Sequence, residues 1–357
     1  MLIPTCSVMF WPKRPMFARP ACRASSKGIG LAACACLALA VAVRPCAQAQ
    51  DHVATQTKLV SLPPLPPNSL KPGPDGLLPG IKRGSLNDVE AVGKRNIGGR
   101  GLGNWYSPRI EAEMGREYAA EIDKSVPLVT DPVVDAYINR IGQKLVKNSD
   151  AKVPFTFRVL DSSQINAFAL PGGYLYVSSG LILAADNEAE LAAVMAHEIA
   201  HVAAHHAMRQ MTREHYSQLG SAPLILFGGW AGYGVVEASN LALPLAFLQY
   251  SRQFEAQADY LGVEYLYRAG YDPTAMITFF EKIAALDKKK PGAMARAFAT
   301  HPQTPARIRA TEDEIAHMLP PRSEYLENTS AFVGVQARLL AMEKQAQQKH
   351  PSVAVEP

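Results

Sequence analysis

His197-Glu198-Ile199-Ala200-His201 is the most informative stretch of this sequence. On a helix, positions 197 and 201 are four steps of about 100° apart, so they face the same direction one turn apart. Two imidazoles placed in this way can bind one Zn²⁺ at about 2.0–2.1 Å. Glu198 is one residue on, where its carboxylate can take a proton from an attacking water and pass it to a leaving amine. The stretch therefore predicts a zinc site with Glu198 as catalytic base.

The residues around this motif are apolar, which favours a metal site over a helix with surface histidines. They are Leu191, Ala192, Val194, Met195, Ala196, Ile199 and Val202. A helix with these residues is mostly buried, and a buried group of polar side chains needs partners. A metal ion supplies such partners, so the context supports the zinc interpretation.

The histidines that follow do not complete the site from the same helix. A third ligand there would require the HExxHxxGxxH arrangement, but Ala204 and Ala207 take two of its positions. A continuous helix from Asn187 to about Met211 would also turn His205 away from the metal. We expect His205 and His206 to support the ligands or to lie at the surface.

The third ligand is expected in the segment 251–259, on a separate helix. Glu255 and Asp259 are one turn apart on the same face of this helix. Glu255 could bind the metal while Asp259 accepts a hydrogen bond from a ligand imidazole and fixes its tautomer. Spacing alone fits a solvated acidic face equally well.

Residues 1–49 predict export from the cytoplasm. Basic residues up to Lys27 precede the apolar run 28–43, and the small-residue site Ala47-Gln48-Ala49 follows, as in a cleavable signal peptide. The expected location is the periplasm. The alternative is an uncleaved inner-membrane anchor through residues 28–43, although this run is shorter than the roughly 20 residues that a span needs.

Composition excludes several classes of function. All five cysteines lie in the first 49 residues, so the remaining chain can form no cysteine nucleophile, cysteine-bound zinc or disulfide. Outside this segment there are 30 basic and 32 acidic residues, which gives no basic excess for nucleic-acid binding. We expect one Zn²⁺ per chain, no small-molecule cofactor and no nucleic-acid partner.

The remaining chain divides into three parts. Residues 50–104 are rich in proline and glycine and are expected to form a linker or wrapping segment, residues 105–320 a peptidase domain, and residues 321–357 a C-terminal helix and a disordered tail. The apolar segment 219–249 is broken by Gly228, Gly229, Gly232, Gly234 and Pro244, so we expect a buried helical hairpin over the active-site helix rather than two membrane spans.

Local patterns predict the elements of the central part. Capping residues and prolines predict helices that start at Ser107-Pro108, Asp131-Pro132, Asn187, Ser251, Asp272-Pro273 and Thr304-Pro305. Alternating or apolar runs predict strands over 155–159, 165–170 and 174–178, and a last helix is expected over about 323–348.

Several stretches together resemble the M48 family of zinc metallopeptidases, most closely its bacterial periplasmic BepA/LoiP-like branch. Besides the two zinc-site segments, they are Tyr106-Ser107-Pro108-Arg109-Ile110-Glu111, Asn166-Ala167-Phe168-Ala169-Leu170-Pro171-Gly172-Gly173, Asn187-Glu188-Ala189-Glu190-Leu191-Ala192, and Thr300-His301-Pro302 with Arg307. They occur in family order over about residues 105–315. The tetratricopeptide array that follows in many members of this branch is not detected as a repeat here.

The resemblance assigns roles to individual residues. It implies that His197, His201 and Glu255 bind zinc, with Glu198 as catalytic base. It places His301 near the metal as a second catalytic residue, either stabilising the oxyanion or occupying the open position and restraining activity. It also implies that Asp259 and Arg307 hold the ligands in place.

The resemblance further implies a substrate-binding strand at Asn166, Ala167 and Phe168. An exposed strand edge can bind a substrate as an added β-strand and so selects unfolded chains. The expected fold is a mostly helical α+β zincin of the gluzincin type, with a small β-sheet beside the active-site helix. The expected function is zinc-dependent cleavage of unfolded or misassembled envelope proteins, including outer-membrane proteins. The alternative is a chaperone-like scaffold that binds clients and contains a structural zinc.

Overall fold

The computed structural model describes most of the chain after residue 76. The described residues are 57–61, 73, 77–216, 250–289, 301 and 305–349. The signal peptide expected at residues 1–49 and the apolar hairpin expected at 219–249 lie outside them. Within the described residues, no helix combines the length and the apolar character that crossing a bilayer requires.

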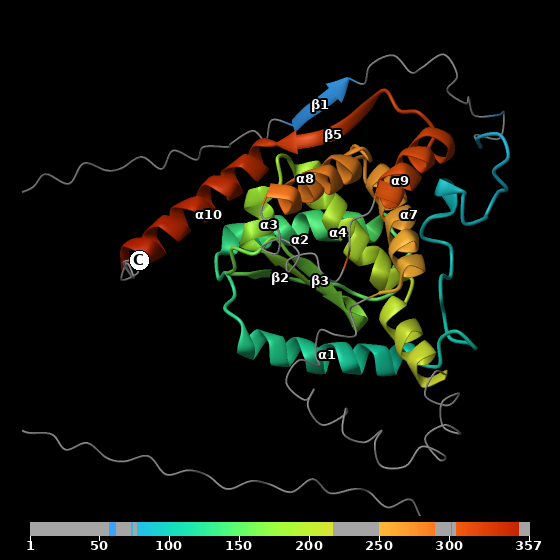
Figure 1. Ribbon diagram of the computed structural model, residues 1–357, viewed down its shortest axis with the longest axis horizontal. Helices are drawn as coiled ribbons and strands as arrows, with labels where there is room; N and C mark the ends of the chain where they lie inside the picture. The colour runs from blue at the N-terminus through green and yellow to red at the C-terminus, as the bar shows by residue number, and fades with distance from the viewer. Residues whose placement is uncertain are drawn as a thin grey trace, which may run out of the picture. The chain divides into compact units, whose positions relative to one another are not determined.

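The described fold is mostly helical and contains a small mixed sheet, as the sequence predicts (Figure 1). The sheet has the strand order β2 (Thr156–Leu160), β4 (Tyr174–Ser178), β3 (Ala167–Leu170). β2 runs parallel to β4, whereas β3 is antiparallel to it and is joined to it by the 3₁₀ turn η2 (Pro171–Gly173). β3 therefore forms one edge of the sheet.

Two helices start with the predicted capping chemistry. α1 (Pro108–Ser125) begins after Ser107, whose hydroxyl accepts a hydrogen bond from the backbone N–H of Ile110. α2 (Pro132–Lys147) begins after Asp131, whose carboxylate accepts hydrogen bonds from the N–H groups of Val133 and Val134. Each cap pairs backbone donors that the first helical turn would otherwise leave free, so the sequence predicts both starts.

The sheet lies between α1 on one face and the core helices on the other (Figure 1). Ala119 and Ile122 of α1 pack with Phe168, Leu170 and Tyr176 of the sheet in one apolar cluster. On the opposite face, α2 and α4 (Glu188–Ala203) contribute to the main core, and all sixteen residues of α4 are buried. This burial explains why α4 carries an apolar sequence around its polar motif.

α7 (Arg252–Arg268) packs closely against α4, and Gly262 lies at their contact. A Cβ atom added to Gly262 would lie 3.2 Å from both the Cα and the backbone nitrogen of His197. The absence of a side chain at this position therefore lets the backbones of α7 and α4 approach closely. This approach brings the first turn of α7 to the motif on α4.

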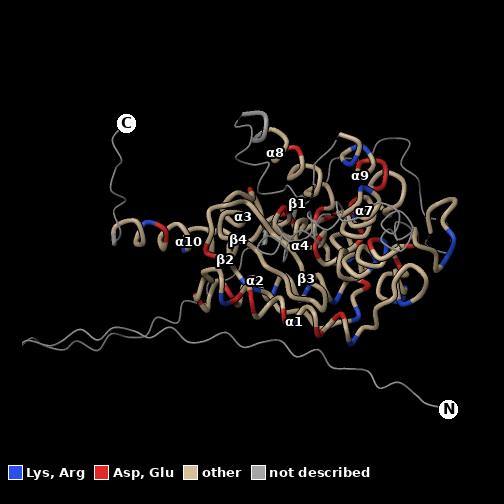
Figure 2. The backbone as a smooth tube through the Cα atoms, turned by 60° about the horizontal axis from the view of Figure 1, so that its bottom comes forward, with Lys and Arg blue, Asp and Glu red and all other residues tan. Residues whose placement is uncertain are grey.

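The remaining elements surround this centre. They are η1 (Val89–Ala91), α3 (Ser179–Ala184), α8 (Ala275–Lys289), α9 (Pro305–Met318), β5 (Glu324–Thr329) and α10 (Ser330–Lys349). Helices were expected after Asp272-Pro273 and Thr304-Pro305, and both are present. α10 packs through Phe332, Val335 and Leu339, and its later residues extend away from the sheet in both views (Figure 2).

The prediction of one helix over 323–348 is wrong in its first part. Residues Glu324–Thr329 form strand β5, which pairs antiparallel with β1 (Thr57–Ser61), and only Ser330 onward is helical. The partner strand is more than 250 residues earlier in the chain, so no local sequence pattern could predict the pairing.

Residues 77–104 lie against the rest of the described fold through several buried side chains. These include Leu77, Leu78, Val89, Ala91, Val92 and Ile97. Arg95 is also buried, and its guanidinium forms ion pairs with Asp150 at 2.6 Å and with Glu264 on α7 at 2.7 Å. This part of the chain is therefore connected to α7 by a buried polar contact as well as by apolar contacts.

Candidate metal centre

The centre is built on α4, whose start is set by local hydrogen bonds. The side chain of Asn187 accepts a hydrogen bond from the N–H of Glu190 at 2.9 Å, and the Glu190 carboxylate accepts one from the N–H of Asp186. This is close to the predicted capping box. The helix then presents His197 and His201 on one face, with their Nε2 atoms 3.0 Å apart. Both histidines are buried, as the sequence predicts.

Glu255 reaches the two imidazoles from the first turn of α7. Its Oε2 lies 3.5 Å from His197 Nε2, and its Oε1 lies 3.5 Å from His201 Nε2. Of the two interpretations of the segment 251–259, a solvated acidic face is wrong, because Glu255 and Asp259 are 3% and 4% exposed. The helix delivers a buried carboxylate to the histidine pair.

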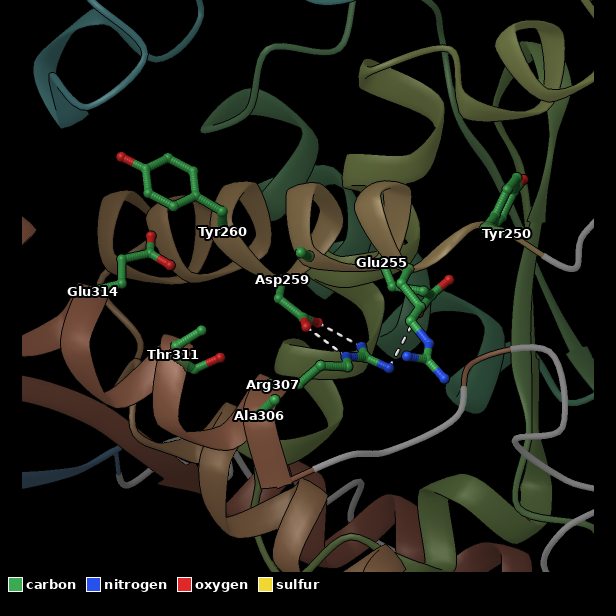
Figure 3. Close-up of a pocket in the computed structure, with 11 residues that line it drawn as sticks. Tyr250, Glu255, Asp259, Tyr260, Ala306, Arg307, Thr311 and Glu314 are labelled. Carbon is green, nitrogen blue, oxygen red and sulfur yellow. Dashed lines mark hydrogen bonds and ion pairs between the residues drawn. The ribbon is translucent and has the colours of Figure 1, made fainter. Parts of the chain in front are cut away.

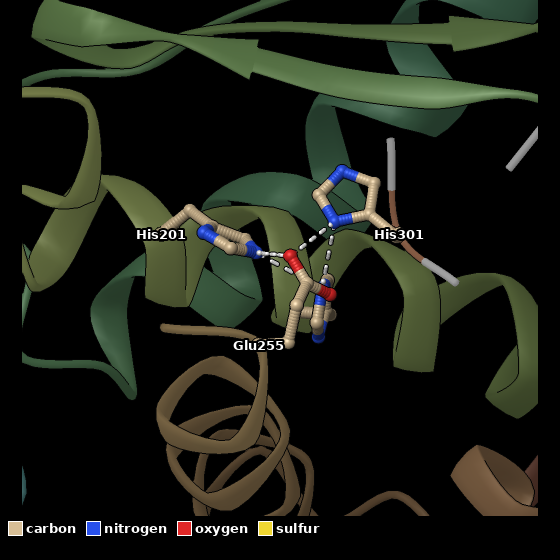
Figure 4. A group of neighbouring side chains, drawn as sticks. His201, Glu255 and His301 are labelled. Carbon is tan, nitrogen blue, oxygen red and sulfur yellow. Dashed lines mark hydrogen bonds and ion pairs between the residues drawn. The ribbon is translucent and has the colours of Figure 1, made fainter. Parts of the chain in front are cut away.

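His301 lies in the same cluster (Figure 4). Its Nδ1 is 2.8 Å from Glu255 Oε1 and 3.5 Å from His197 Nε2. One ligand atom from each of His197, His201, Glu255 and His301 lies within 4.8 Å of all the others, and all four residues are buried. Sequence reasoning without the resemblance gives no reason to place His301 here.

This donor set fits a transition metal. Three imidazoles and one carboxylate provide nitrogen and oxygen donors of the kind that bind Zn²⁺ in four-coordinate sites. Mg²⁺ and Ca²⁺ prefer sites made only of oxygen ligands. The four ligand atoms are also close enough to share one ion, so the residues present fit the predicted cofactor.

Asp259 and Arg307 hold His197 from behind. Asp259 Oδ1 lies 2.9 Å from His197 Nδ1, and the Arg307 guanidinium donates two hydrogen bonds of 2.6 Å to the Asp259 carboxylate. Burial raises the pKa of Asp259, but Arg307 and His197 outweigh this effect and lower the pKa below its usual value. Asp259 therefore stays ionised and can accept the Nδ1–H of a neutral His197.

The two histidines of α4 differ electrostatically. Burial lowers the pKa of His197, but the carboxylates of Asp259 and Glu255 raise it to about 9. Burial and the neighbouring His197 lower the pKa of His201 well below its usual value. The carboxylates around His197 thus favour a positive charge, while His201 keeps a nitrogen lone pair. A bound metal cation would supply the charge and accept this lone pair.

Glu198 lies between the cluster and strand β3. Its Oε2 accepts a hydrogen bond of 3.1 Å from the backbone N–H of Ala169. Its Oε1 is buried and receives no hydrogen bond from any described residue, and His301 Nε2 is 3.5 Å away. Burial raises the pKa of Glu198, although His301 and His197 oppose the shift. Oε2 is therefore held by a hydrogen bond, while Oε1 is available to accept a hydrogen bond or a proton.

The predicted substrate-binding residues lie at the start of the edge strand. Asn166 bonds through its backbone to Ser178, and Ala167 and Phe168 pair with Val177 and Tyr176 of β4. The Phe168 ring stacks on Tyr176 within the α1 cluster and is not brought to the metal ligands. Because strand groups alternate in direction, the backbone groups of Ala167 and Ala169 point to the free edge.

The expectation of a continuous helix through Met211 is wrong. α4 ends at Ala203, His205 adopts φ of +53°, and helical structure resumes over 206–216. The side chain of His205 lies 2.6 Å from Glu111 of α1. Positive φ is uncommon for residues other than glycine, although histidine is among those that adopt it more often, so little in the sequence indicated the break.

The break brings His206 back to the centre. His206 Nδ1 lies 2.8 Å from His201 Nδ1, and His206 Nε2 lies 3.1 Å from the side-chain oxygen of Gln257. Tyr250 also stacks on the His201 ring, with the ring centroids 4.1 Å apart. Sequence reasoning missed Gln257, Tyr250 and the Ala169 N–H. The only feature of the sequence that pointed to Gln257 was its position two residues after Glu255.

Comparison with known proteins identifies the family of this chain. The model of "Peptidase family M48" matches residues 132–315, which is just over half of the chain. The Escherichia coli K12 beta-barrel assembly-enhancing protease is 33% identical over 253 residues, covering 68% of this chain and 51% of that protein. A putative beta-barrel assembly-enhancing protease from Vibrio cholerae is 36% identical over 217 residues, covering 58% and 44%.

A mitochondrial relative is more distant. The mitochondrial metalloendopeptidase OMA1 of Schizosaccharomyces pombe is 32% identical over 182 residues, covering 50% of this chain and 52% of that protein. The chain thus spans about half the length of the curated relatives it matches. The matched region contains both helices of the metal cluster, and on these grounds the chain belongs to peptidase family M48.

Proposed function

We propose that this protein is a zinc-dependent endopeptidase that cleaves internal peptide bonds of unfolded or misassembled cell-envelope proteins. The observation that carries the proposal is the convergence of His197 and His201 from α4 with Glu255 from α7, beside the buried carboxylate of Glu198. Two imidazoles and one carboxylate are a ligand set of catalytic zinc sites in peptidases.

The residues divide the chemistry between them. His197, His201 and Glu255 would hold the metal, which when bound lowers the pKa of water and polarises the scissile carbonyl. Glu198 accepts the proton of the attacking water and transfers it to the leaving amine. The Ala169 N–H keeps one oxygen of Glu198 in place, so the other oxygen can receive the proton.

The proposed substrates bind to β3 as an added strand. The segment Asn166, Ala167 and Phe168 belongs to the edge of the sheet, and the same strand contacts Glu198 through Ala169. An extended substrate paired with this edge would therefore pass the catalytic base. Most backbone groups of a folded protein are already paired within its own helices and sheets, which favours unfolded clients. The names of the bacterial relatives refer to beta-barrel assembly, so we propose outer-membrane proteins among the clients.

We propose that His301 restrains activity by occupying the fourth ligand position in this conformation. Its contacts with Glu255 Oε1 and His197 Nε2 support this role over stabilisation of the oxyanion, because its Nδ1 lies among the ligand atoms. His301→Ala is then expected to raise casein cleavage. Loss of cleavage with unchanged zinc content would instead support the oxyanion role.

We also propose that residues 1–49 direct export to the periplasm and are removed there. Sequencing of the mature N-terminus after residue 49 would support this location. The alternative, an inner-membrane anchor through residues 28–43, predicts an intact N-terminus and a protein that resists extraction by alkaline carbonate.

The central test compares zinc content and casein digestion in three proteins. Glu198→Gln is expected to keep zinc and lose digestion, because only the proton acceptor changes. Glu255→Ala is expected to weaken or lose zinc and also lose digestion, because a ligand is removed. Wild-type protein should contain one zinc per chain and digest casein.

The same experiment separates the peptidase from a client-binding scaffold. A scaffold with a structural zinc predicts that Glu198→Gln retains full function in cells and that wild-type protein leaves casein intact. Digestion by Glu198→Gln at the wild-type rate would contradict the role of Glu198 as base.

A further inference from the structure

A pocket adjoins the metal centre between α7 and α9 (Figure 3). It has a volume of about 460 Å³ and is lined by one face of each helix. Glu255 belongs both to the metal cluster and to this pocket lining. The pocket therefore begins at the centre where the cleaved bond would lie, and it continues along the two helices.

The far part of the pocket contains two buried polar groups that form no hydrogen bond with any described residue. Glu314 is 6% exposed and Thr311 is 1% exposed. Within the described residues, Glu314 Oε1 and Thr311 Oγ1 form no hydrogen bond. They lie three residues apart on the face of α9 that is turned toward α7 (Figure 3). A buried carboxylate and hydroxyl without partners are costly, and a ligand with hydrogen-bond donors would remove this cost.

The charges along the pocket favour a cation at this far part. Arg307 lines the end of the pocket near the metal centre, where its guanidinium lies 3.2 Å from Glu255 Oε2, and it already donates two hydrogen bonds to Asp259. Arg252 lines the pocket from the first turn of α7 and is exposed. Burial, together with the nearby carboxylates of Glu264 and Asp259, raises the pKa of Glu314 well above its usual value, although the Arg95 guanidinium opposes this shift. A bound cation would offset these carboxylates and allow Glu314 to ionise.

The walls suit an aliphatic chain that ends in a cation. Between the metal centre and Glu314 the lining includes the small apolar residues Ala306 and Ala310. Lysine and arginine carry a stem of methylene groups that covers apolar surface and a charged head that needs hydrogen-bond acceptors. Neither an acidic nor a purely apolar side chain would satisfy Glu314.

We propose that this pocket is a substrate subsite for a lysine or arginine side chain, with Glu314 and Thr311 binding its charged head. The proposal rests on the peptidase function above. Arg307 and Glu314 are seven residues apart on α9, which is about 10 Å along the helix. An extended substrate covers this distance in about three residues. The basic residue therefore lies within three positions of the cleaved bond.

The test uses internally quenched peptides that differ at one position only. Lysine is compared with norleucine, which has the same stem without the ammonium group, at each of three positions on either side of the cleaved bond. For the full-length zinc protein, kcat/KM at one position is expected to be about ten- to a hundredfold higher with lysine, as for a buried charged hydrogen bond.

Variants assign this preference to the pocket. Glu314→Gln keeps the shape of the side chain and should bring the lysine-to-norleucine ratio close to one, and Thr311→Val should lower the ratio less. Glu312→Gln, which changes an exposed glutamate on the same helix, should keep the wild-type ratio. A wild-type ratio near one at all positions, or an unchanged ratio in Glu314→Gln, would overturn the proposal.

A binding measurement separates this proposal from the peptidase function. If wild-type protein cleaves neither peptide, the proposed function fails, and fluorescence anisotropy with labelled peptides and the zinc-loaded Glu198→Gln protein decides the subsite. Tighter binding of the lysine peptide supports the subsite, and equal affinities contradict it. Circular dichroism and melting temperature confirm that each variant is folded.

Discussion

Each imidazole of α4 is supported through the nitrogen that does not face the other ligands. For His201 the support is a chain of hydrogen bonds in which each donor and acceptor can be assigned. A neutral His201 that binds metal through Nε2 carries its proton on Nδ1 and donates it to His206 Nδ1. His206 must then carry its own proton on Nε2, where the oxygen of Gln257 accepts it while also accepting from Arg209. The chain of contacts fixes one tautomer of His201.

Removal of His206 tests this support. His206→Ala is expected to lower zinc affinity about 10- to 100-fold, because His201 loses the acceptor that holds its tautomer and ring orientation. Competition with a chelator measures the affinity, and excess zinc should restore most of the casein digestion. His317→Ala, which removes an exposed histidine of α9, should leave the affinity unchanged. Equal affinities of both variants would contradict the role of His206.

At the scale of the elements, the position of α7 against α4 decides whether Glu255 reaches His197 and His201. The contact depends on Gly262, since a Cβ there would meet the backbone of His197 at 3.2 Å and the end of Met276 at 3.1 Å. Backbone atoms of a buried helix cannot move aside as a flexible side chain can. A small change at Gly262 should therefore displace the helix that carries Glu255.

Gly262→Ala is expected to lower the free energy of unfolding by about 1–3 kcal/mol, as overpacking of a core contact does. It should also weaken zinc binding, although no ligand is changed. Gly334→Ala is the matched control: this glycine lies within α10 with nothing within 4 Å of the added Cβ. Alanine should stabilise that helix by up to about 1 kcal/mol. Urea unfolding of both variants measures the difference, and equal effects would contradict the close approach.

At the scale of the whole molecule, segments far apart in the chain meet in a buried charged group. Arg95 from the segment before α1 pairs with Asp150 after α2 and with Glu264 of α7. Burial raises the pKa of Glu264 to about 7, and the nearby Asp150 carboxylate adds to this rise. Arg95 lowers the pKa but does not cancel these effects. One arginine thus balances two buried carboxylates incompletely, and the ionisation of Glu264 affects how firmly these segments are held.

This arrangement predicts a pH dependence of stability. The pKa of Glu264 is higher in the folded protein than its ordinary value of 4.5, so folding favours the protonated form. Its contribution is complete below about pH 4.5 and is lost as the pH rises through 7. The shift of about 2.5 units corresponds to about 3 kcal/mol. Glu264→Gln should remove this loss between pH 5 and 8 in urea unfolding.

The control for this measurement is Glu117→Gln, since Glu117 is exposed on α1. It should keep the wild-type decline in stability with pH. A decline in Glu264→Gln as steep as in wild-type protein would show that other groups cause it.

Much of the local structure could be predicted because its causes are local. Ser107, Asp131 and Asn187 predict helix starts, because their side chains accept hydrogen bonds from backbone groups no more than three residues away. The structure confirms these three starts. The break at His205 and the strand β5 could not be predicted in the same way. The first depends on an uncommon backbone angle held by Glu111, and the second on pairing with β1.

The sequence by itself determined which side chains could carry the chemistry, because the spacing of His197 and His201 on a helix places them on one face without any other part of the molecule. Only the tertiary structure decided that Glu255 and His301 meet these histidines and that the N–H of Ala169 meets Glu198. The physical reason is the range of the forces involved. Caps and helical periodicity act over a few residues, whereas the convergence of α4, α7 and β3 depends on how buried surfaces from distant parts of the chain fit together.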